Sequence, residues 1–109
     1  MKSEALYVRH VLEAIQKIES YLGDTDFEKF SDNDMMIDAV ARELEIIGEA
    51  AGQCGEAFKK SNPEVPWKEA IGMRNRLIHE YFGVDLSVVW TTCKEDLPFL
   101  KAALMKIKI

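Results

Sequence analysis

Apolar residues recur along this chain every three or four positions, the spacing that places them on one face of an α-helix. No stretch shows the strict alternation of apolar and polar residues that is typical of a half-buried strand. One amphipathic stretch runs from about Ser3 to Leu22, and another from Ser31 or Asp32 to about Cys54. The hydrophobic pattern therefore predicts an all-α fold.

Two further helices are expected in the second half of the chain. Pro66 suits the first turn of a helix that ends between residues 80 and 83, because a missing N–H costs nothing there. Asp85 is the expected N-cap of the last helix. The apolar stripe of that last helix stays in phase across Pro98, which favours one kinked helix over two separate ones. The four main helices predict an up-and-down bundle.

The helix expected from about 32 to 54 is apolar on two sides. Its main stripe includes small residues such as Ala41, Gly48 and Ala51, which would let a neighbouring helix approach closely. Its second apolar seam consists of Met36, Ala39, Ile46 and Ala50. A helix with two apolar sides is either central to its bundle or part of a subunit interface. In so short a chain the interface interpretation is attractive, and it predicts a homodimer.

Composition narrows the class of protein. The 109 residues are expected to form a single domain, 1–109, that needs no disulfide or metal to fold. Cys54 and Cys93 have no partners at metal-ligand spacing and are interpreted as core residues, so neither a metal nor a cofactor is expected. No apolar run approaches the length of a membrane span, and the first ten residues lack the apolar core of a signal peptide. A cytoplasmic location without membrane contact is the expectation.

The net charge of −5 argues against a protein that coats nucleic acid non-specifically. It leaves room for a small nucleic-acid site with local cations. It fits a protein held by a basic protein partner equally well.

Residues 74–81 contain the candidate functional side chains. Their sequence is Arg74-Asn75-Arg76-Leu77-Ile78-His79-Glu80-Tyr81. If the helix opens at Pro66, its apolar stripe consists of Trp67, Ala70, Ile71, Leu77 and Ile78, and Arg74 falls in the middle of it. Arginine is rarely buried without a partner, and positions that break local rules tend to be functional or strained. A role for Arg74 beyond packing is therefore expected.

The residue types suit cleavage of an RNA phosphodiester. Histidine can transfer protons near neutral pH, and arginine can hold a phosphate and neutralise its developing charge. RNA supplies its own nucleophile, the 2′-hydroxyl. Arg74 and His79 are five residues and so about 140° apart on a helix, a gap that a second copy of the motif would close. The alternative is a purely structural role, with a surface ion pair between Arg76 and Glu80 and a packed Tyr81. Spacing alone does not decide between the catalytic and the structural interpretation.

Two longer segments carry a family resemblance. Residues 65–85, from Val65-Pro66-Trp67 through the motif to Phe82-Gly83-Val84-Asp85, and residues 38–51, with Ile46-Ile47-Gly48-Glu49-Ala50-Ala51, resemble the HepT branch of the HEPN superfamily. HepT is the toxin half of a HepT/MntA toxin–antitoxin pair. The resemblance covers nearly the whole chain, and the Arg-x4-His-x-Tyr motif with Asn after the Arg is present without departure.

The resemblance implies a dimeric four-helix HEPN bundle in which two motifs face one another across a cleft. It implies a metal-independent endoribonuclease with Arg74 and His79 as the catalytic pair and Asn75 as a supporting residue. It also implies a cognate MntA-like nucleotidyltransferase antitoxin that neutralises the toxin by AMPylation of Tyr81. Two alternatives remain beside the nuclease. One is a non-catalytic partner that presents a nucleotide or substrate to the transferase, and the other is a dimerisation module with a relic motif.

Overall fold

The computed structural model describes residues 2–79 and 85–107, and every regular element in these ranges is helical. The elements, in chain order, are α1 (Lys2–Leu22), α2 (Phe27–Ser31), α3 (Asp34–Gln53), α4 (Glu56–Ser61), α5 (Trp67–His79), α6 (Leu86–Thr91), the π-helical turn η1 (Thr92–Asp96) and α7 (Leu97–Met105). The all-α prediction is confirmed for these residues. None of the described helices is long and apolar enough to cross a membrane.

Short polar side chains set where the helices begin. The carboxylate of Asp85 accepts a hydrogen bond from the Ser87 N–H at 3.0 Å, which confirms the predicted cap of the last helix. The Asn33 side chain accepts from the Met36 N–H at 3.0 Å, and α3 begins at Asp34, two or three residues later than predicted. Ser31 instead ends the short helix α2, which Asp26 caps.

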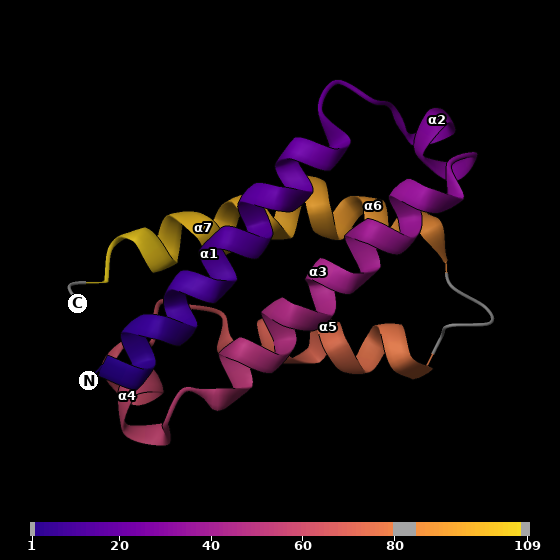
Figure 1. The fold of residues 1–109 in the computed structure, drawn as a ribbon. Coiled ribbons are helices and arrows are strands. Elements are labelled where there is room, and N and C mark those ends of the chain that lie inside the picture. Colours follow the sequence, from indigo (N-terminus) through magenta and orange to yellow (C-terminus); the bar gives the residue numbers. More distant parts are fainter. Residues whose placement is uncertain (1, 80–84, 108–109) are drawn as a thin grey trace.

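The core lies where the predicted apolar stripes meet. Figure 1 shows α1 and α3 side by side, with α5 crossing α3 on one side and α7 lying behind α1, and these are pairs of helices in contact. The largest fully buried side chains come from α1, α2, α3 and α7: Val8, Val11, Ile15, Ile18, Phe30, Val40, Leu44, Ile47, Leu97 and Leu100. This packing holds α3 in the middle, where it contacts both α1 and α5. The residues that α3 turns towards α5 therefore determine where α5 and its motif lie.

The last helical stretch runs from Leu86 to Met105 without a break. Just before Pro98 the backbone widens into the π-helical turn η1, where the Leu97 N–H donates to the Thr92 carbonyl, five residues back. Proline cannot donate an N–H, and wider turns of this kind are one way in which a helix absorbs that loss. The continuity predicted across Pro98 is thus present, while the predicted kink stays a prediction.

Candidate functional site

The segment before α5 fixes the start of the motif helix. The Trp67 indole is buried, its Nε1–H donates to the Asn62 carbonyl at 3.0 Å, and its ring packs edge-on against Phe58 with 5.9 Å between centroids. The Ala70 N–H donates to the Pro66 carbonyl at 3.0 Å and closes the first turn. These contacts anchor α5 at the end opposite His79.

Arg74 lies at the point where α5 meets α3. A Cβ added at Gly48 of α3 would lie 2.5 Å from the Arg74 Cβ, 3.0 Å from its backbone N and 3.2 Å from its Cα. The root of Arg74 therefore packs directly on the glycine backbone, as its place on the apolar stripe predicts. The residue as a whole is nevertheless exposed, because a long arginine side chain can leave an apolar interface by its tip.

Met73, which the predicted stripe omitted, is the residue of this turn that is buried. Together with Trp67 and Ala70 it supplies the inward face of α5 in the described part of the helix. The core of this region is therefore apolar without any contribution from the guanidinium. The Arg74 side chain is therefore accessible to a ligand from the solvent.

The other predicted site residues stand at the far end of the motif. Asn75 and His79 belong to the helical backbone of α5, so they remain four residues apart on a regular helix, and their side chains lie outside the described part. Tyr81 also lies outside the described residues, which resume at Asp85. Of the four predicted site residues, the structure thus places the complete side chain of Arg74.

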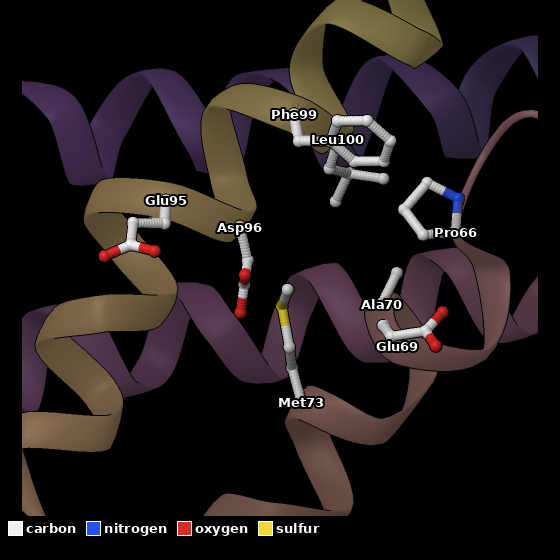
Figure 2. Close-up of a pocket in the computed structure, with 8 residues that line it drawn as sticks. All are labelled: Pro66, Glu69, Ala70, Met73, Glu95, Asp96, Phe99 and Leu100. Carbon is white, nitrogen blue, oxygen red and sulfur yellow. The ribbon is translucent and has the colours of Figure 1, made fainter.

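The two sides of the α5 N-terminal half differ in charge. On one side a pocket of about 550 Å³ is lined by Pro66, Glu69, Ala70, Met73, Glu95, Asp96, Phe99 and Leu100. Figure 2 shows this pocket with its carboxylates contributed by α5 and η1 around an apolar interior. Three carboxylates repel a phosphate, so this pocket does not suit an RNA backbone.

A second depression, of about 500 Å³, is lined by Lys59, Trp67, Lys68, Ile71 and Gly72, between α4 and α5. Lys68 is exposed, whereas Lys59 is mostly covered and pairs with Glu56 at 3.4 Å. Lys68 precedes Arg74 by six residues, about 9 Å along a helix axis. Six residues also turn a helix by about 240°, so Lys68 and Arg74 lie about 120° apart around α5 and do not share one side.

Neither cysteine is available as a nucleophile. Burial raises the pKa of the Cys54 thiol, and it raises the pKa of Cys93 to about 12. Both residues therefore stay protonated at neutral pH, in agreement with their interpretation as core residues. Among the described residues, no group of three or more His, Cys, Asp or Glu side chains is arranged to hold a metal ion.

An all-helical fold, with an Arg-x4-His-x-Tyr sequence that begins on an exposed arginine of α5, defines a HEPN-type helical protein. The HepT-like family, described as ribonuclease HepT-like, matches residues 11–107. The chain belongs to this family. The family resemblance inferred from the motif and its flanking segments is thereby confirmed.

Individual relatives extend the match along nearly the whole chain. The chain is 44% identical over 107 residues to a probable ribonuclease HepT of Thermococcus cleftensis, a match that covers 98% of this chain and 97% of the relative. It is 42% identical over 95 residues, 87% of each chain, to a protein of Methanocaldococcus jannaschii named as a putative RNase. A second protein of that organism, named as a gamma-glutamylcyclotransferase and putative RNase, is 42% identical over 97% of this chain and 48% of its own length. No solved structure gave a significant match.

Proposed function

We propose that this protein is the toxin of a toxin–antitoxin pair and acts as a metal-independent endoribonuclease. The observation that carries the proposal is the position of Arg74, whose root packs on Gly48 of α3 while the residue as a whole is exposed. Membership of the HepT-like family, and relatives named as ribonucleases, support the same activity.

In the proposed reaction Arg74 binds the scissile phosphate and His79 transfers protons. The RNA 2′-oxygen attacks phosphorus while a base removes its proton, the bond from phosphorus to the 5′-oxygen breaks, and an acid protonates that oxygen. The products are a 2′,3′-cyclic phosphate and a free 5′-hydroxyl, so the atoms balance without a metal-bound water. Proton transfer of this kind contributes about 10²–10⁴-fold in rate. Asn75 supports the pair by orienting the imidazole or a phosphate oxygen.

The proposal includes a homodimer of four-helix HEPN bundles, each with a kink at Pro98. Residues five apart on one helix diverge by about 140°, so two facing motifs bring an arginine and a histidine together better than one motif does. The second apolar seam of α3 supports such an interface, since Met36 and Ile46 remain only half-buried, and Leu6 of α1 is 45% exposed. In the dimer, one copy of His79 serves as base and the other as acid.

Neutralisation is proposed to occur at Tyr81, through a cognate MntA-like nucleotidyltransferase that uses ATP. The tyrosine oxygen attacks the α-phosphorus of ATP, the bond to the β-phosphate breaks, pyrophosphate leaves and the phenolic proton is released. An AMP group seven residues from Arg74 adds bulk and a negative charge that competes for the same cation. The intact mass of the protein should rise by whole AMP units after incubation with ATP and the transferase. Modification of Tyr81→Phe to the same extent would refute the site.

The nuclease is tested with protein purified without the transferase, incubated with single-stranded RNA in EDTA. Wild-type protein should cleave, Arg74→Ala should lose about 10²–10³-fold in kcat/KM, and His79→Ala about 10²–10⁴-fold. Arg9→Ala is the matched control, because it removes one exposed arginine from α1 and changes the net charge equally. Intact RNA in every sample would refute the nuclease and leave the non-catalytic partner of the transferase, which the net charge of −5 favours.

A further inference from the structure

Two glycines of α3 have opposite surroundings. Gly48 is buried, and an added Cβ there would meet the Cβ, N and Cα of Arg74 at 2.5, 3.0 and 3.2 Å. Gly52, four residues later, is exposed, and an added Cβ would meet nothing within 4 Å. Figure 1 shows α5 crossing α3, and Gly48 of α3 lies in close contact with Arg74 of α5.

The contact atoms at Gly48 have no freedom to move aside. Backbone N, Cα and Cβ move only with the helix that carries them, whereas the end of a flexible side chain could rotate away. Any side chain at position 48 therefore has to push α5 away from α3. The missing side chain of Gly48 sets the distance between the two helices at the residue that begins the motif.

We propose that Gly48 is a positioning residue for Arg74: by allowing α5 to approach α3, it fixes the root of the arginine and so the place that its guanidinium reaches. This inference rests on the proposed nuclease function. The Arg74 side chain is exposed and the core of this turn is supplied by Met73, so the close approach serves the location of Arg74 rather than the burial of its side chain.

The test compares Gly48→Ala with Gly52→Ala, the same chemical change one helical turn away in open space. A displacement of about 1 Å in a reacting group can cost about 10²-fold in rate. We expect kcat for RNA cleavage to fall about 10²-fold in Gly48→Ala and to stay within about twofold of wild type in Gly52→Ala. In an Arg74→Ala background, Gly48→Ala should cause a smaller further loss than it causes in wild type, because the arginine through which most of its effect acts is absent.

RNA binding supplies a readout that partial unfolding does not change. In a His79→Ala background, which leaves the RNA intact, the slope of log K against log salt concentration should weaken by about 0.7 for each phosphate that the protein no longer neutralises. Gly48→Ala should shift this slope in the same direction as Arg74→Ala, and Gly52→Ala should leave it unchanged. A smaller folded fraction would lower the binding capacity without altering the slope.

Circular dichroism at the assay temperature shows whether Gly48→Ala is folded, and if it is not, the measurements are made in the Gly52→Ala background, which is expected to be more stable. Wild-type protein that leaves RNA intact would refute the proposed nuclease and this inference together. Active wild type with an equally active Gly48→Ala, or an unchanged salt slope in that variant, would refute the positioning role alone.

Discussion

The two glycines of α3 also allow a sharp prediction about stability. Replacing glycine by alanine inside a helix raises the free energy of unfolding by about 0.8–1.0 kcal/mol, because alanine loses less backbone freedom on folding. At Gly52 nothing lies within 4 Å of the added methyl group, so Gly52→Ala should keep most of this gain. The position is one residue from the end of α3, where a value nearer about 0.5 kcal/mol is reasonable.

At Gly48 the same gain is opposed by a clash with Arg74. The added Cβ would lie 2.5 Å from the Arg74 Cβ, whereas ordinary contacts begin at 3.4 Å, so α3 and α5 must separate locally by most of an ångström. Overpacking of this kind costs about 1–3 kcal/mol. Subtracting the helix gain gives a Gly48→Ala protein between unchanged and about 2 kcal/mol less stable than wild type. With a gain of about 0.5 kcal/mol at Gly52, the two variants should therefore differ by about 0.5–2.5 kcal/mol.

Urea denaturation followed by circular dichroism measures this difference. All proteins are compared at one concentration, because dimer formation would make the apparent stability depend on concentration. In thermal melts, each kcal/mol should correspond to about 4–8 °C for a domain of this size. If Gly48→Ala proved as stable as Gly52→Ala, the close contact between α3 and Arg74 would be wrong, and the positioning role of Gly48 with it.

Two further predictions concern the core. Phe30 is fully buried with its ring centroid 5.4 Å from that of Trp90, so Phe30→Ala should cost about 3–5 kcal/mol, measured by urea denaturation; a loss below about 1 kcal/mol would contradict this packing. Burial raises the pKa of Cys93 from 9.0 to about 12, so the folded protein retains a proton that the unfolded chain releases above pH 9. The free energy of unfolding should therefore fall between pH 9 and 12, by at most about 1.4 kcal/mol per pH unit from this group. Urea denaturation at several pH values should show a steeper fall in wild type than in Cys93→Ala. Equal slopes in the two proteins would refute the raised pKa of Cys93.

Helices with strong apolar stripes could be predicted from the amino-acid sequence alone. A period of 3.6 residues is a local property, so the inward faces of α1, α3 and the last helical stretch follow without knowledge of their neighbours. The Asp85 cap was equally local, since its carboxylate bonds to a backbone N–H two residues away. The helix α4 was missed because none of its residues is buried, and it therefore has no stripe to detect.

The periodicity of the sequence could not show which residue Arg74 contacts or whether its side chain is exposed. The pattern placed its backbone on the inward side of α5, and the small residues of α3 indicated that some helix would approach closely. The structure shows that both predictions concern the same contact: Gly48 lies against Arg74, and the arginine remains exposed. Which residues meet at a crossing depends on the mutual position of helices that are distant in the chain, whereas the helical period relates only residues within one helix. The helical period determines the direction of the Arg74 Cβ, whereas the charge of the guanidinium favours its exposure to solvent.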